Sequence, residues 1–477
     1  MSAPNILLIV SDDHGYGDRS ALGSHDAQTP HLDALARSGM EFTNAYVTAP
    51  ICSPSRAGLI AGAYQQRWGA HWFDTSRFPL KERKVLPEML GENGYDCGYF
   101  GKVHYGHEQL GDRACPDQHG FATSFYGLAG PSMGRLHYLT HSAEALQEHG
   151  PDVQRVHGVS PLYENGTPVD TYQHLTVELA DRTIDFLETD RPKGEEQPFF
   201  CYTAFNAVHN FTWQLPQEEL EARGLPSYSD FDPDVADYVD WYDGAISPNL
   251  ENGRAYYLAQ LEIMDREIGR ILDSLERSGQ RENTLVVYMT DNGGSTCNYG
   301  DNSPLEGTKY SLYEGGIRVP LLVSWPSTVS PRQTSDALVS SLDLVPTFLQ
   351  AAGADGPQDA TLDGRPLQQV WDGNGAGHEY LHFDTGFQWA VRNREWKLRW
   401  ADPENDEYRR RILLVEHTDI GAGLSLVPIG SSVDESDAAD CSAEHPEVVR
   451  DLLEERSHWL DSIAGEQHDL INREEKS

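Results

Sequence analysis

Short apolar runs that each end in a cluster of polar residues recur along the chain. Four of them stand out: Asn5–Val10, Tyr95–Phe100, Pro198–Phe205 and Asn283–Thr290. Each has the length and the apolar content of a buried β-strand. The pattern therefore predicts at least four strands, each delivering polar side chains at its carboxyl end.

Between these runs lie segments whose apolar residues recur at helical spacing. The clearest are Thr29–Gly39, Val85–Gly94, Thr176–Thr189 and Ala255–Gly279. Strands that alternate with helices are typical of an α/β fold. We therefore expect a large central, mostly parallel sheet flanked by helices.

The pattern changes beyond residue 355, where the chain becomes rich in Gly and Asp. We place a boundary there, with an N-terminal α/β domain at 1–372 and a smaller C-terminal domain at 373–477. In the latter, Trp389–Trp400 alternates like a strand or hairpin, and His445–Ile463 reads as an amphipathic helix. This predicts an α+β domain with antiparallel strands and a terminal helix. Residues 401–440 show no pattern that assigns them to an element.

Composition excludes several classes of partner and site. The 477 residues carry a formal charge of −39, which argues against nucleic acid or an anionic membrane as partner. The N-terminal apolar run is too short to span a membrane and lacks the features of a signal peptide. We expect a cytoplasmic protein if Met1 is the native start, and a periplasmic or secreted one if the sequence has been trimmed. The six cysteines include no C-x-x-C pair, so they predict neither a zinc site nor a disulfide framework.

Polar residues follow the predicted strands closely, at the positions where α/β sheets bind ligands. They are Asp12, Asp13, Lys102, His104, His209, Asp291 and Asn292. The two acidic pairs offer hard oxygen donors, which suit Ca²⁺ or Mg²⁺. The alternative for either pair alone is a helix cap or a solvated turn. Arg56, Lys102 and Lys309 supply the opposite charge, and together with a dication they suit a tetrahedral oxyanion such as sulfate or phosphate.

Cys52 stands directly before Ser-Pro-Ser-Arg and a small, apolar segment that predicts a helix. Pro54 fits the first turn of that helix. The helix dipole and Arg56 would then both favour a thiolate at Cys52. A thiolate nucleophile and a buried structural cysteine are both compatible with these residues alone.

The segment Cys52–Gly62 resembles the sulfatase signature Cys-x-Pro-Ser-Arg-x-x-x-Leu-x-x-Gly, with Ala61 where the family often has Thr. Four further segments are similar to that family, which belongs to the alkaline phosphatase-like superfamily: Pro4–Asp18, Gly98–Gly106, Thr290–Gly294 and Gly307–Pro320. Two features depart from the family pattern. The segment around His209 reads A-V-H-N-F, and the C-terminal domain lacks the usual Leu-Tyr-Asp-Leu stretch.

The resemblance implies an enzyme that hydrolyses sulfuric esters with a formylglycine made from the cysteine of the signature. It implies one Ca²⁺, with Mg²⁺ as an alternative, held by Asp12, Asp13, Cys52, Asp291 and Asn292. The implied catalytic residues are Cys52, Arg56, Lys102, His104, His209 and Lys309. Arg56 and Lys102 would hold charge, His209 or Lys309 would act on the leaving oxygen, and His104 would accept a proton. A formylglycine-generating enzyme acting on Cys52 is the implied partner.

The substrate is less constrained by the sequence. Trp68–Phe78 and Gly134–His141 carry Trp, His and Arg in predicted loops, where rings could stack on a sugar. Ordinary loop packing is the alternative. We expect a sulfated carbohydrate, with an arylsulfatase or a phosphonate or phosphate monoester hydrolase as alternatives. A non-catalytic anion- or Ca²⁺-binding protein with unmodified Cys52 is the third possibility.

Overall fold

The computed structural model describes most of the chain between residues 3 and 474. The gaps are 107, 129–136, 142, 145–146, 148–159, 189–190, 192–196, 230–234, 236–249, 358–360, 374, 403, 408, 410–422 and 430–433. Within the described part, no helix combines the length and apolar character that a membrane crossing needs.

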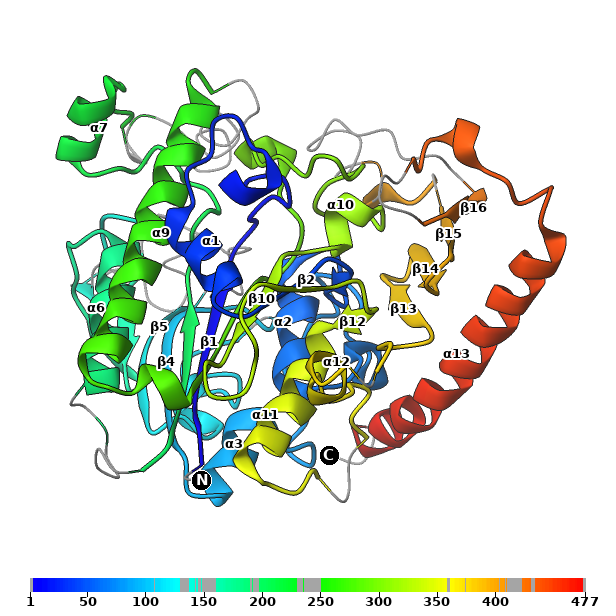
Figure 1. The fold of residues 1–477 in the computed structure, drawn as a ribbon, viewed down its shortest axis with the longest axis horizontal. Helices are drawn as coiled ribbons and strands as arrows, with labels where there is room; N and C mark the ends of the chain where they lie inside the picture. The colour runs from blue at the N-terminus through cyan, green and yellow to red at the C-terminus, as the bar shows by residue number, and fades with distance from the viewer. Residues whose placement is uncertain are drawn as a thin grey trace.

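A ten-stranded sheet forms the centre of the molecule, in the order β11-β2-β10-β9-β1-β8-β4-β5-β6-β7 (Figure 1). Its strands are β1 Asn5–Ser11, β2 Met40–Phe42, β4 Asp96–Val103, β5 Thr123–Leu128, β6 Leu162–Glu164, β7 Thr167–Val169, β8 Phe199–Ala204, β9 Thr284–Thr290, β10 Leu321–Ser324 and β11 Gln333–Ser335. The five central strands, from β9 to β5, run parallel to one another. Antiparallel pairs flank them on both sides, so the predicted fold class is confirmed.

Helices cover both faces of this sheet. The α-helices of the described residues, including those elsewhere in the fold, are α1 Pro30–Arg37, α2 Cys52–Ala61, α3 Leu86–Glu92, α6 Leu175–Glu188, α7 Gln217–Arg223, α9 Gly253–Arg277, α10 Glu314–Ile317, α11 Leu344–Ala352, α12 Gln368–Trp371 and α13 Pro446–Glu474. A separate two-stranded pair joins β3 Ala45–Tyr46 to β12 Val339–Ser340. The four strands and four helices predicted from the N-terminal pattern are all present.

The alternation of side chains along a strand explains the two layers of helices. In β1, Ile6 and Leu8 belong to the core cluster that contains α2, α3 and α11 residues. Leu7 and Ile9 point the other way, into the cluster formed with α1, α6 and α9. A strand buried on both faces must be apolar throughout, which is why its sequence reads as an uninterrupted run.

The C-terminal region forms a four-stranded antiparallel sheet in the order β13-β14-β15-β16. Its strands are β13 Leu381–Asp384, β14 Gln388–Arg392, β15 Trp396–Ala401 and β16 Gly423–Pro428. The predicted hairpin is confirmed, with Trp389 opposite Trp400. Helix α13 runs along the side of this sheet (Figure 1), and its Trp459 packs in one cluster with Tyr64 and Leu342 of the larger region. The boundary at 372/373 stays a prediction.

One glycine in the central sheet is required by close packing. Gly101 of β4 has φ +135°, and a Cβ added there would lie 1.8 Å from the carbonyl oxygen of Ala204 in β8. We expect Gly101→Ala to lower the free energy of unfolding by about 3 kcal/mol or more, because β4 and β8 would have to separate. Gly94→Ala is the matched control, because Gly94 has φ +89° but nothing within 4 Å of the added Cβ. Thermal unfolding of both variants measures this, and equal melting points would contradict it.

Candidate active site

The candidate residues come from different elements and converge at the carboxyl edge of the central strands. Asp12 and Asp13 follow β1, Asp291 and Asn292 follow β9, and the register pairs Ser11 with Thr290. The others are Lys102 at the end of β4, His104 just beyond it, His209 after β8, Cys52 and Arg56 in α2, and Lys309 in the loop before α10. All of these side chains are buried. The structure therefore brings together every site residue that the sequence predicts.

Asp12 is surrounded by positive charge and by the thiol of Cys52. Lys102 Nζ forms an ion pair with Asp12 Oδ2, and Arg56 Nη2 lies 3.4 Å from the same oxygen. The Cys52 thiol donates to Asp12 Oδ1 at 3.7 Å. Burial alone would raise the pKa of Asp12, but Lys102, His209 and Arg56 lower it well below its usual range. Asp12 is therefore a carboxylate at any physiological pH.

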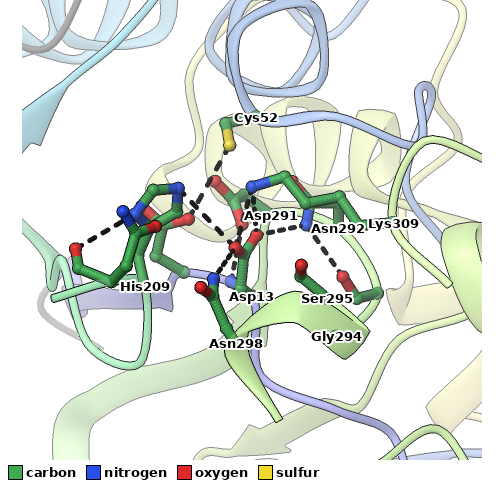
Figure 2. Close-up of polar contacts among 12 residues, drawn as sticks. Asp13, Cys52, His209, Asp291, Asn292, Gly294, Ser295, Asn298 and Lys309 are labelled. Carbon is green, nitrogen blue, oxygen red and sulfur yellow. Dashed lines mark hydrogen bonds and ion pairs between the residues drawn. The ribbon is translucent and has the colours of Figure 1, made fainter. Parts of the chain in front are cut away.

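Asp13 lies at the centre of the second cluster of contacts (Figure 2). Lys309 Nζ is 2.7 Å from Asp13 Oδ1 and 2.8 Å from Oδ2, and the Asn292 amide donates to Oδ1 at 2.7 Å. His209 Nε2 lies 3.7 Å from Oδ2, on the side of Asp13 away from Lys309 in this view. The place of His209 next to Asp13 agrees with its predicted place in the site.

Asn298 is a site residue that the sequence analysis missed. Its amide Nδ2 donates to Asp13 Oδ2 at 2.9 Å, and the residue is buried. It ends the 3-10 turn Thr296–Asn298, six residues after Asn292. No strand end or motif marks this position, so only the path of the loop reveals it.

A hard cation fits the residues gathered here. One ligand atom from each of Asp12, Asp13, Cys52 and His209 lies within 4.8 Å of the others. The Oδ1 atom of Asn292 is buried and has no hydrogen-bond partner within the described structure. Two carboxylates and an amide oxygen suit Ca²⁺ or Mg²⁺. Asp291, the remaining expected ligand, lies beside this group: its Oδ2 accepts from Arg56 Nε at 2.7 Å, and its Oδ1 accepts from the Asp13 N–H at 3.4 Å. Its role as a metal ligand stays a prediction.

The thiolate hypothesis for Cys52 is not supported. Cys52 does begin helix α2, as predicted, but burial raises the pKa of its thiol to about 12, against the opposing charges of Lys102 and Lys309. Arg56 does not point at the sulfur; its guanidinium pairs with Asp291 and Asp12. A protonated, buried thiol is a poor nucleophile. Unmodified Cys52 therefore does not explain the site.

Both histidines of the site are neutral at physiological pH. Burial, with Lys102 and Arg56, lowers the pKa of His104 well below its usual range. Burial and Lys309 lower the pKa of His209 to about 4, although Asp13 opposes this. Burial also raises the pKa of Asp291 to about 6, against the opposing charge of Arg56. Neutral imidazoles can accept protons, which is the role the sequence analysis gave to His104.

The loops that suggested sugar stacking are packed instead. Trp68 and Trp72 are each only 3% exposed, and their indole N–H groups donate to Arg77 O and Glu407 Oε2. This corrects the expectation of an exposed tryptophan platform at 68–78. In the second loop, His141 is buried and bonded to the Ser160 and His137 carbonyls. Residues 134–136 lie outside the described part of the chain.

Known proteins share this architecture and these segments. The sulfatase family model matches residues 4–354. Bovine (Bos taurus) arylsulfatase A is 32% identical over 427 residues, covering 84% of this chain and 75% of the relative. Mouse (Mus musculus) arylsulfatase J is 28% identical, covering 96% and 76%. The crystal structure of Ps i-CgsB is similar at 29% identity and a TM-score of 0.76, covering 96% of this chain and 93% of that one. The chain therefore belongs to the sulfatase family, and it is a hydrolase of sulfate esters.

Proposed function

We propose that the protein releases inorganic sulfate from a sulfated carbohydrate, with formylglycine made from Cys52 and one bound divalent cation, Ca²⁺ in preference to Mg²⁺. One observation carries this proposal. Cys52 begins α2 with its sulfur 3.7 Å from Asp12, in the field of Lys102 and Lys309. A thiol held neutral there makes no nucleophile, whereas an aldehyde at the same place would face a pocket of fixed positive charge.

The residues around Cys52 have separate roles in the proposed reaction: some would bind the cation, and others would stabilise the charge of the sulfate group. Asp12, Asp13, Asn292 and Asp291 would hold the cation, which would supply positive charge beside residue 52. The formylglycine, once hydrated, would supply the attacking oxygen. Lys102 and Arg56 lie against Asp12, and Lys309 lies against Asp13. These fixed cations would stabilise the negative charge of the sulfate group in the transition state.

We assign proton transfer to His104 on one side of the reaction and to His209 or Lys309 on the other. His104 is neutral and buried, and it takes a proton from residue 52 as the sulfate leaves. His209 and Lys309 both lie against Asp13, and one of them would stabilise or protonate the leaving oxygen of the substrate.

A carbohydrate is the substrate class that the comparisons favour. Ps i-CgsB was crystallised in complex with k-i-k-neocarrahexaose, at 27% identity and a TM-score of 0.76 with this chain. N-acetylgalactosamine-6-sulfatase of Canis lupus familiaris is 29% identical over 394 residues. Several curated relatives are named arylsulfatases, so an aryl sulfate is the competing substrate.

Sulfate release from a defined panel of substrates tests this proposal. The panel holds oligosaccharides of carrageenan, chondroitin sulfate, heparan sulfate and fucoidan, together with 4-nitrophenyl sulfate and 4-nitrophenyl phosphate. We expect kcat/KM for at least one oligosaccharide to exceed that for 4-nitrophenyl sulfate by about 100-fold, since only the sugar adds contacts beyond the sulfate. Cys52→Ala protein is the blank. Preference for the aryl ester would contradict the carbohydrate assignment, and no release by modified protein from any ester would support the binding-protein alternative.

A further inference from the structure

We infer that Gln388, on strand β14 of the C-terminal sheet, is a positioning residue that holds Lys309 against Asp13. The inference rests on the role proposed above for Lys309. Gln388 is separated from Lys309 by 79 positions in the sequence, and in the described structure its side chain bonds to Tyr310 and Leu312 rather than to Asp13 or Cys52. It acts through the backbone of the residue that follows Lys309.

The backbone next to Lys309 has an unfavourable conformation. Tyr310 has φ +73°, in the left-handed region that a bulky side chain rarely adopts. Such a conformation persists only when its surroundings hold it, and it is found most often at functional sites. The contacts that hold Tyr310 therefore decide where Lys309 points.

Two distant segments hold the backbone of Tyr310, one through its N–H and the other through its carbonyl. Its N–H donates to the carbonyl of Pro50, two residues before Cys52, at 2.7 Å. Its carbonyl accepts from Gln388 Nε2 at 2.6 Å. Gln388 Oε1 also accepts from the Leu312 N–H at 3.2 Å, so one side-chain amide bonds both sides of the turn. Gln388 is 2% exposed, so its side-chain amide is shielded from bulk solvent.

These hydrogen bonds connect the C-terminal sheet to the turn that carries Lys309. The Lys309 N–H donates to the Gly294 carbonyl at 3.1 Å, which fixes the start of the turn. Lys309 Nζ then reaches Asp13, lying 5.5 Å from the centre of the Tyr310 ring. If the bond from Gln388 is lost, Tyr310 can relax toward negative φ, which rotates the peptide it shares with Lys309. The ammonium would then move away from the position it holds over Asp13.

The test is a double-variant cycle on the formylglycine-bearing, full-length protein, assayed with 4-nitrophenyl sulfate and with the best oligosaccharide of the panel. Gln388→Met keeps the size of the side chain and removes both hydrogen bonds. We expect kcat to fall by at least about 10-fold with KM changed by less than about threefold, because positioning acts in the transition state. Gln368→Met is the matched control, since Gln368 is a buried glutamine that donates to the Thr347 carbonyl at 2.8 Å.

The cycle separates positioning from general destabilisation. In a Lys309→Ala background, Gln388→Met should lower kcat no further, because its effect passes through Lys309. Tyr310→Gly should recover part of the kcat lost in Gln388→Met, because glycine adopts positive φ without support. Equal fold losses in both Lys309 backgrounds would overturn the inference, as would wild-type kcat in Gln388→Met.

Two further results complete the test. If Gln388→Met fails to fold, Gln388→Glu keeps the acceptor for Leu312 and replaces the donor to Tyr310 by a carboxylate oxygen; wild-type kcat in that variant would equally overturn the inference. If Lys309→Ala alone keeps wild-type kcat, the role proposed for Lys309 fails. A loss in Lys309→Ala without one in Gln388→Met would leave that role standing and reject Gln388.

Discussion

Cys52→Ala should lower kcat for sulfate release by at least about 10⁴-fold, the scale seen when a covalent nucleophile is removed from an enzyme. Among the described residues, Cys52 is the cysteine that groups with Asp12, Asp13 and His209, where the attacking oxygen is proposed to form. The fold should survive, because the change removes one buried sulfur at the start of α2 and leaves the contacts of Arg56 and Lys102 with Asp12 in place. Steady-state sulfate release and thermal unfolding measure the two effects separately.

Cys201→Ala is the matched control for this variant. Cys201 is also fully buried, in strand β8, and its thiol bonds only to Thr203 in the described structure. It should lose some stability and keep its kcat. Cys52→Ser should be nearly as inactive as Cys52→Ala, because an alcohol lacks the elimination route of an aldehyde hydrate. If Cys52→Ala retained activity within about tenfold of the wild type, residue 52 would not be the nucleophile.

Asp13→Asn should abolish the stabilisation that Ca²⁺ gives the protein. For the wild type, Ca²⁺ at about 100 times its Kd should raise the free energy of unfolding by about 2.7 kcal/mol, since the ion binds only the folded chain. In Asp13→Asn we expect Ca²⁺ affinity to fall by at least about 100-fold, because one of the two clustered carboxylates loses its charge. Isothermal titration and thermal unfolding across a Ca²⁺ series measure both quantities without any substrate.

Asp265→Asn provides the control for this prediction. Asp265 is an equally buried carboxylate, but it accepts from the backbone of His31 and Leu32 at the start of α1. That variant should lose stability and still respond to Ca²⁺ like the wild type. Stoichiometric zinc in the purified protein, with neither calcium nor magnesium, would contradict the assignment of a hard cation.

The place of the site was predictable because strand ends meet. Asp12 and Asp291 each follow an apolar run, and parallel neighbours such as β1 and β9 bring their carboxyl ends to one edge. The position of Cys52 at the start of a helix was likewise predictable, from Pro54 and the small apolar residues that follow it. These features depend on short stretches of chain, where pattern and structure correspond directly.

Features set by the packing of distant segments were not predictable. Arg56 pairs with Asp291 rather than facing Cys52, because the tilt of α2 over the sheet decides which groups it meets. Trp72 looked available to a ligand, yet it packs in one cluster with Tyr310 and Phe387, which lie hundreds of residues away. Asn298 contacts Asp13 because of the course of the loop that follows Asn292. Gln388 contacts Tyr310 because the C-terminal sheet packs against the loop that carries Lys309. The sequence offers no local signal for either contact.

We propose that sulfate release by this chain requires formylglycine at position 52. The dependence of the rate on the fraction of Cys52 that has been converted tests this directly. Preparations made with different amounts of formylglycine-generating enzyme are digested, and mass spectrometry gives the fraction of the residue 52 peptide that has lost hydrogen sulfide and gained oxygen. The rate of sulfate release is measured on the same preparations. We expect the rate to be proportional to that fraction, on a line through zero. Full activity in a preparation whose Cys52 is entirely thiol would contradict it.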